Sequence, residues 1–181
     1  PERFHSLTTM AVPHSGRFLA EAMLHPKQLL LSWYMLFFQL RGIADYVVER
    51  NDYRFIERLW RNWSPGWDFP RETIEDVIRT LRAPGVKEAA LGYYRASLAP
   101  SALPITSEKR RAARYKIEVP TLALTGEEDG CIDSGVFQAL MHPEDFPNGL
   151  DVQCVSGVGH FLHQENPEKI NALLLNFLQQ R

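Results

Sequence analysis

The sequence is poor in features that mark a specialised class of protein. Its two cysteines, Cys131 and Cys154, are too few for a disulfide framework, which excludes the disulfide-rich secreted domains. A net charge of −2 gives no general attraction to nucleic acid or to an anionic membrane. No apolar run approaches the roughly 20 residues that span a bilayer. We therefore expect a reduced, cytoplasmic globular protein without a nucleic-acid or membrane partner.

The start of the chain also lacks expected features. It opens on Pro1 rather than on an initiator methionine, and an apolar segment of strand length, residues 6–12, follows almost at once. A strand so near the terminus has no preceding elements to lead into it. We therefore expect the chain to be the C-terminal part of a longer protein, with residues 6–12 as an exposed edge strand through which copies could associate.

Three segments have the pattern of buried parallel strands. Residues 6–12, 120–125 and 150–158 are short, rich in Val, Thr or Leu, and bounded by Pro or Gly. A helix is expected around residues 134–141, and a last helix begins at Asn166, with an apolar face formed by Ile170, Leu173, Leu174, Phe177 and Leu178. Strands that alternate with helices indicate a doubly wound α/β sheet.

The middle of the chain has a different character. Residues 15–105 show helical periodicity and contain all four tryptophans. Helices inserted between two strands of a sheet can form a lid over a cleft. We therefore divide the chain into a first core strand (residues 1–14), a helical cap (residues 15–105) and a C-terminal α/β core segment (residues 106–181).

An acid and a histidine follow the second and third predicted strands. Asp129 and His160 should lie together, because functional loops gather at the carboxyl ends of parallel strands. A carboxylate beside a histidine fixes its tautomer and supports the imidazolium that forms in proton transfer. Glu127 and Glu128 are rival acids and His163 is a rival base. Alternatively, Asp129 caps a turn and His160 is a surface loop residue.

The nucleophile that such a pair normally serves is absent. It is expected upstream, on a strand-to-helix turn with the pattern Gly-x-(Ser/Asp/Cys)-x-Gly, and no such pattern occurs in the sequence. We also expect no metal and no cofactor, because the six histidines are scattered and neither cysteine belongs to a C-x-x-C pair.

Several segments resemble the epoxide hydrolases of the α/β-hydrolase superfamily. They occur in the right order over nearly the whole chain: Pro13-His14, residues 32–40 (SWYMLFFQL), residues 91–95 (LGYYR), residues 126–131 (GEEDGC) and residues 157–168. The resemblance implies a partial α/β-hydrolase fold, in which three parallel strands with flanking helices carry an inserted helical cap.

The resemblance also implies roles for individual residues. Tyr34 and Tyr94 are the lid phenols that donate hydrogen bonds to the epoxide oxygen, Asp129 is the acid of the triad, and His160 is its base. A tyrosine in an aromatic helix can instead be a core residue. Tyr93 is adjacent to Tyr94 and on a helix points elsewhere, so only one of the two should face the cleft.

Phe161 and Trp33 are expected to bind substrate. Haloalkane dehalogenases of the same superfamily hold a halide with donors such as an indole N–H, and Trp33 could take that role. Its neighbour Tyr34 cannot point in the same direction, and the pair of tyrosines favours an epoxide.

The function implied is the opening of a small apolar epoxide through an alkyl-enzyme ester to give a diol. This chain would supply lid, acid and base, and would be inactive alone because it has no nucleophile. Two alternatives stay open. The chain could be a non-catalytic remnant or interaction module, or part of a haloalkane dehalogenase or esterase of the same fold.

Overall fold

The computed structural model describes residues 3–101, 106, 108–109 and 114–180. Its sheet consists of three parallel strands, β1 (Leu7–Met10), β2 (Thr121–Gly126) and β3 (Leu150–Val155), in the order β1-β2-β3. The three predicted parallel strands are confirmed, but only β2 is buried along its length, whereas β1 and β3 are partly exposed. β3 ends three residues earlier than expected, because a turn with Gly157 at a positive φ of 75° follows it.

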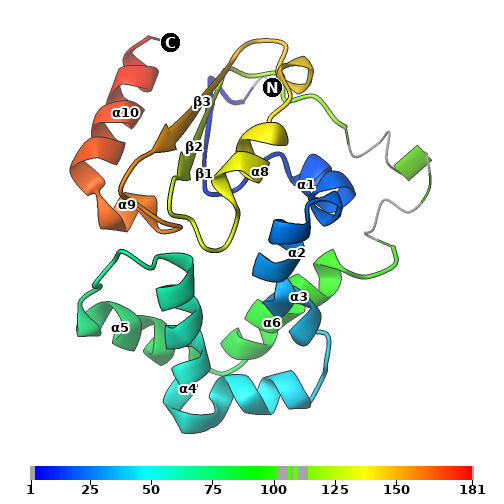
Figure 1. Ribbon diagram of the computed structural model, residues 1–181, viewed down its shortest axis with the longest axis vertical. Coiled ribbons are helices and arrows are strands. Elements are labelled where there is room, and N and C mark those ends of the chain that lie inside the picture. Colours follow the sequence, from blue (N-terminus) through cyan, green and yellow to red (C-terminus); the bar gives the residue numbers. More distant parts are fainter. Residues whose placement is uncertain (1–2, 102–105, 107, 110–113, 181) are drawn as a thin grey trace.

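β2 is the central strand and is buried along its whole length. Leu122 and Leu124 pack toward α10 (Pro167–Gln179), whereas Ala123 belongs to the core on the opposite face, beside α8 (Ser134–Ala139). Figure 1 shows these helices on either side of the sheet. Because both faces of β2 are packed, the loop at its carboxyl end has a rigid base.

The helices that flank the sheet begin at capped residues. The side chain of Asn166 accepts a hydrogen bond from the Lys169 N–H at 3.1 Å, and Pro167 takes the first turn of α10. Asp133 accepts one from the Val136 N–H at 3.0 Å at the start of α8. Each cap satisfies an N–H group that would otherwise lack a partner. The predicted start of the last helix is therefore confirmed.

A layer of helices separates β1 from β2 in the sequence and lies beside the carboxyl ends of the strands (Figure 1). It contains the short 3₁₀ helix η1 (Ala22–Leu24) and the helices α1 (Ser15–Glu21), α2 (Pro26–Leu31), α3 (Trp33–Phe37), α4 (Ile43–Trp63), α5 (Arg71–Leu81) and α6 (Val86–Ser97). The described part of the chain has no helix long and apolar enough to cross a membrane. The division into a first core strand, a helical cap and a C-terminal segment stays a prediction, and its boundary at residue 105 lies outside the described residues.

α4 is interrupted by a sharp turn. The residues Asn51, Asp52 and Tyr53 adopt positive φ angles of 52°, 60° and 57°, and helical geometry resumes after them. Figure 1 shows that the second half of α4 then runs toward the loops of the sheet. The turn therefore carries Trp63, the last residue of α4, to the strand ends.

β1 pairs with β2 on one side, and no strand among the described residues pairs with its other side. The N–H of Leu7 donates to Pro120, just before β2, and the N–H of Ala11 donates to Leu124 of β2, so by alternation the Thr8 N–H points outward. We expect self-association through this edge, seen as dimers in sedimentation at micromolar concentration. Thr8→Pro should weaken it by removing the outward donor, whereas Thr8→Val should not. A monomeric wild-type chain would contradict this prediction.

Candidate active site

Asp129 and His160 form a hydrogen-bonded pair at the carboxyl ends of β2 and β3. The His160 Nδ1–H donates to Asp129 Oδ2 at 3.0 Å. The other carboxylate oxygen, Oδ1, accepts the backbone N–H groups of Cys131 at 2.7 Å and Ile132 at 2.9 Å. Both oxygens of the buried Asp129 carboxylate are thus held by hydrogen bonds. Because Nδ1 of His160 donates to Asp129, Nε2 is the ring nitrogen of His160 that can take a proton.

The rival acids and base lie elsewhere. Glu127 and Glu128 are exposed in the turn after β2, and His163 is exposed on the short helix α9 (Leu162–Glu165). The structure therefore brings together the pair that the sequence favoured and leaves its rivals at the surface.

The loops that carry this pair meet the end of α4 at close range. The Trp63 carbonyl oxygen accepts the N–H groups of both Gly130, at 3.0 Å, and His160, at 3.1 Å. A Cβ atom on Gly130 would lie 1.9 Å from a backbone oxygen of α4, and one on Gly159 would lie 2.7 Å from the Cα of Ser64. Glycine is required at both positions because any side chain would push the acid and base loops away from the helix.

Ser64 and Glu165 hold the backbone of the histidine loop. The Ser64 hydroxyl donates to Glu165 Oε1 at 2.7 Å and accepts the N–H groups of His160 at 3.0 Å and Phe161 at 3.3 Å. Glu165 also accepts the N–H groups of Gly159 at 2.7 Å and Phe161 at 3.0 Å. No sequence pattern points to Ser64 or Glu165, because their partners come together only in the folded chain.

We expect Ser64→Ala to destabilise the chain by about 1–3 kcal/mol, because it leaves buried partners of the hydroxyl unsatisfied. Urea unfolding would measure the loss, and the imidazole NMR signals of His160 should shift. Ser156→Ala, which changes an exposed serine after β3, is the matched control. Equal stability of the two variants would show that Ser64 does not hold the loop.

Tyr34 on α3 and Tyr94 on α6 face each other, with ring centroids 5.5 Å apart. Both line a cavity of about 220 Å³ that is also lined by Cys131 and His160. Burial, followed by the neighbouring Cys131, raises the pKa of both phenols, that of Tyr94 to about 12. Both side chains therefore stay protonated near neutral pH and can act as hydrogen-bond donors.

Both Tyr93 and Tyr94 line the cavity, contrary to the expectation that only one of the two faces the cleft, but they differ in exposure. Tyr94 is half-buried against Tyr34, whereas Tyr93 is 70% exposed. The structure thus places Tyr94 inside and leaves most of Tyr93 in solvent.

Trp33 is not among the residues that line this cavity, contrary to the expectation that it binds substrate there. It is 46% exposed and packs against Phe37 and Phe55. Because Tyr34 points into the cavity, the preceding residue on the same short helix points away from it. The indole beside the site belongs instead to Trp63, whose ring centroid lies 5.3 Å from that of His160.

Phe161 lies next to His160 but does not line the cavity either. Its ring stacks on Trp60 at 4.1 Å and meets the His160 ring edge-on at 5.3 Å. Phe161 therefore joins the histidine loop to the helical layer, and a direct contact with substrate stays a prediction.

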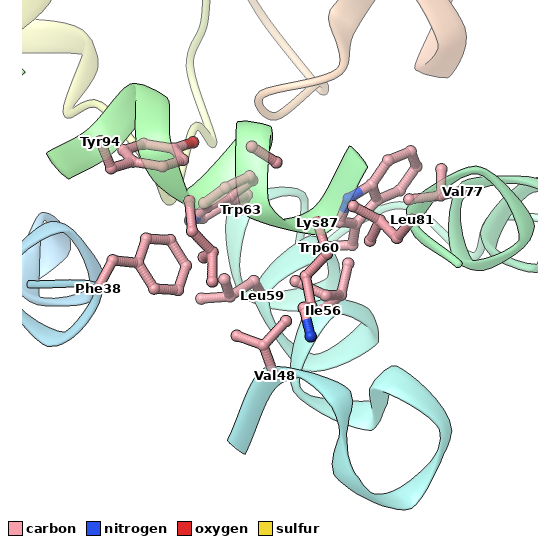
Figure 2. Close-up of a pocket in the computed structure, with 12 residues that line it drawn as sticks. Phe38, Val48, Ile56, Leu59, Trp60, Trp63, Val77, Leu81, Lys87 and Tyr94 are labelled. Carbon is pink, nitrogen blue, oxygen red and sulfur yellow. The ribbon is translucent and has the colours of Figure 1, made fainter. Parts of the chain in front are cut away.

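A second cavity, of about 180 Å³, lies within the helical layer (Figure 2). Its lining is apolar apart from Lys87, and includes Phe38, Leu59, Trp63 and Tyr94. The two cavities share Trp63 and Tyr94, which gives the site apolar surroundings on its helical side.

The pKa of His160 results from opposing effects. Burial lowers it, but the hydrogen bond to Asp129 and the neighbouring Cys131 raise it more, to about 10 from an ordinary value of 6.5. Since the folded chain binds this proton more tightly than the unfolded chain, the stabilisation is complete below pH 6.5 and is lost as the pH rises through about 10.

We therefore expect the melting temperature to fall as the pH is raised from 6.5 to about 10. Circular dichroism would follow the transition. His160→Gln should remove most of this dependence, and His163→Gln, which changes an exposed histidine, should keep it. If the melting temperatures of wild type and His160→Gln depended on pH in the same way, the imidazolium of His160 would not stabilise the fold.

Asp129, Cys131 and His160 also offer three groups of the kind that bind metals, with one atom of each within 4.8 Å of the others. The sequence spacing did not predict this cluster. Asp129 uses both carboxylate oxygens as acceptors of N–H groups, so a metal ion would have to displace hydrogen bonds already made. The arrangement suits proton transfer better than metal binding.

No family model matches the chain. The chain is 27% identical over 185 residues to epoxide hydrolase 4 of Homo sapiens, an alignment that covers 99% of this chain and 48% of that protein. It is also 27% identical to the AB hydrolase superfamily protein YfhM of Bacillus subtilis, which covers 99% of this chain and 59% of that protein. The chain thus spans about half the length of the curated relatives it matches.

Solved structures show the same similarity in three dimensions. The crystal structure of the Bacillus megaterium epoxide hydrolase in complex with an inhibitor aligns with a TM-score of 0.77 at 22% identity, over 99% of this chain and 62% of that one. The Cif epoxide hydrolase of Acinetobacter nosocomialis aligns with a TM-score of 0.72 at 20% identity, over 98% and 55%. These alignments confirm the resemblance and the fold class that the sequence predicted.

Proposed function

We propose that this chain, which has the α/β-hydrolase fold and is homologous along its length to epoxide hydrolases, provides the acid, the base and the lid phenols for opening small apolar epoxides to diols. The observation that carries the proposal is that Tyr34, Tyr94 and His160 line one cavity. The homology extends to epoxide hydrolases as a class, and the reaction is our inference from the geometry of the site.

The phenols fit the first step of such a reaction. When a nucleophile attacks a carbon of the epoxide ring, negative charge grows on the oxygen. Tyr34 and Tyr94 pack edge to face in the lining of the cavity and hold protonated hydroxyls, so both can donate to that oxygen and one can finally give it a proton.

The acid and base fit the second step. An alkyl-enzyme ester is hydrolysed by a water molecule that a base deprotonates. The neutral form of His160 presents Nε2 for that proton, while Asp129 holds Nδ1–H and stabilises the imidazolium that forms. The nucleophile of the first step would come from a part of the protein beyond this chain.

A haloalkane dehalogenase is a second candidate, favoured by the position of Trp63. Its ring lies 5.1 Å from Tyr34 and 5.3 Å from His160, and it lines the cavity, so an indole N–H donor is present beside the base. The pair of phenols favours the epoxide.

A cytoplasmic, reducing environment remains part of the proposal, since Cys131 and Cys154 are both unpaired.

The test is to compare this chain alone with the same chain preceded by whatever its gene encodes upstream of Pro1. We expect the chain alone not to turn over styrene oxide, and the longer form to produce the diol if an aspartate occupies the upstream elbow. A serine there would favour an esterase, and an inactive longer form would favour a non-catalytic module. Repeated turnover by the chain alone, abolished by His160→Ala, would contradict the assignment of the nucleophile to a missing segment.

A further inference from the structure

Cys131 occupies a position in the cavity that the proposed reaction does not use. The residue is 4% exposed overall, yet it lines the same cavity as Tyr34 and His160. Its backbone N–H donates to Asp129 Oδ1 at 2.7 Å, which fixes the residue directly beside the acid. A thiol in this place can meet any small molecule that enters the cavity.

The groups around the sulfur suit a nucleophile. The Sγ atom, a ring nitrogen of His160 and a carboxylate oxygen of Asp129 lie within 4.8 Å of one another, and the Tyr34 hydroxyl lies 3.3 Å from Sγ. A histidine held by a carboxylate can take the proton of a thiol, and a phenol can donate a hydrogen bond to the thiolate that forms.

From this geometry we propose that Cys131 is an activated thiol that small electrophiles entering the cavity alkylate, with His160 as the base. The acid, base and nucleophile would then be Asp129, His160 and Cys131, all within this chain. The choice of an epoxide as the natural electrophile rests on the proposed function, whereas the activation of the thiol does not.

The reaction with an epoxide balances without any further reactant. His160 takes the thiol proton, the sulfur forms a bond to a ring carbon, and the carbon–oxygen bond of that carbon breaks. The oxygen receives a proton from Tyr34 or Tyr94, which His160 can restore. The product is a β-hydroxy thioether that carries the whole mass of the epoxide. Because a thioether is not an ester, water does not release it, and each chain reacts once.

Cys154 provides a matched internal control. It is exposed on β3, and partial burial of its thiol together with the nearby Glu127 raises its pKa. If solvent exposure alone decides the rate of alkylation, Cys154 should react faster. If activation by a base decides it, Cys131 should react faster.

The experiment measures alkylation of the 181-residue chain by iodoacetamide and by styrene oxide, in the presence of a metal chelator. Peptide mass spectrometry assigns each adduct in wild type, Cys154→Ser, Cys131→Ser and Cys154→Ser/His160→Gln. The rate of alkylation of each thiol in the wild-type chain unfolded in urea serves as the reference without the folded surroundings. This comparison does not depend on the folding of any variant. Circular dichroism checks the fold of each variant.

We expect Cys131 to react faster in the folded chain than in urea and faster than Cys154. His160→Gln should slow its reaction by about a hundredfold, the lower end of what a positioned general base contributes. Preferential labelling of Cys154, or a folded-state rate at Cys131 no higher than in urea, would overturn the inference.

The two probes separate this inference from the proposed function. Labelling of Cys131 by iodoacetamide that depends on His160, without labelling by styrene oxide, would support the activated thiol and count against epoxides as occupants of the cavity. Labelling by both probes would support both. A rate at Cys131 that His160→Gln leaves unchanged would overturn the thiol inference, whatever the enzyme does with epoxides.

Discussion

His160→Gln should trap the alkyl-enzyme ester in any form of the protein that carries the nucleophile. Ring opening needs no base, so substrate should still be consumed once per enzyme molecule. Hydrolysis of the ester should slow by about 10²–10⁴-fold, because the variant cannot accept the proton of the attacking water. Glutamine keeps a polar group of similar reach, so the hydrogen bond to Asp129 can be retained in part.

Intact-mass spectrometry after addition of substrate would show the adduct, and single-turnover kinetics would give the two rates. His163→Gln is the control, since it alters an exposed histidine three residues away and should hydrolyse the ester at the wild-type rate. If substrate were consumed at the wild-type rate and no adduct appeared, direct attack by water would replace the two-step mechanism.

Removal of the hydroxyl of Tyr34 or of Tyr94 is expected to slow ring opening by about 10²–10³-fold, or about 2.7–4 kcal/mol, if each is a donor to the developing oxyanion. Tyr34→Phe and Tyr94→Phe keep the aromatic ring and therefore the packing between the two side chains. The effect should fall on alkylation and leave hydrolysis of a preformed ester nearly unchanged.

Rapid-mixing measurements of adduct formation would test this expectation. Tyr46→Phe is the control, because Tyr46 lies on α4, is largely exposed and does not line the cavity. A control variant as slow as Tyr94→Phe would assign the effect to the helical layer as a whole and not to the hydroxyl of Tyr94. Wild-type alkylation rates in both Tyr34→Phe and Tyr94→Phe would remove the phenols from the mechanism.

The sequence by itself determined the order of the strands along the chain and the chemistry at their ends. A run of Leu, Ala and Thr bounded by Pro and Gly located β2, because a strand packed on both faces must be apolar along its length. The run before Gly157 located β3, which is only partly buried. The carboxyl ends of parallel strands share one edge of the sheet, so the sequence predicted that Asp129 and His160 lie together, and the structure places them 3.0 Å apart.

Only the tertiary structure decided which aromatic and polar groups join that pair. Trp33 and Trp63 are the same residue type, and both lie in segments with helical periodicity. The orientation of α3 and the turn within α4 place Trp63 at the site and Trp33 outside it. The contact between the Cys131 sulfur and Tyr34 joins residues 97 positions apart, and that between Ser64 and His160 joins residues 96 apart. Local periodicity reports which face of its own element a side chain occupies, whereas such contacts depend on how distant elements pack against one another.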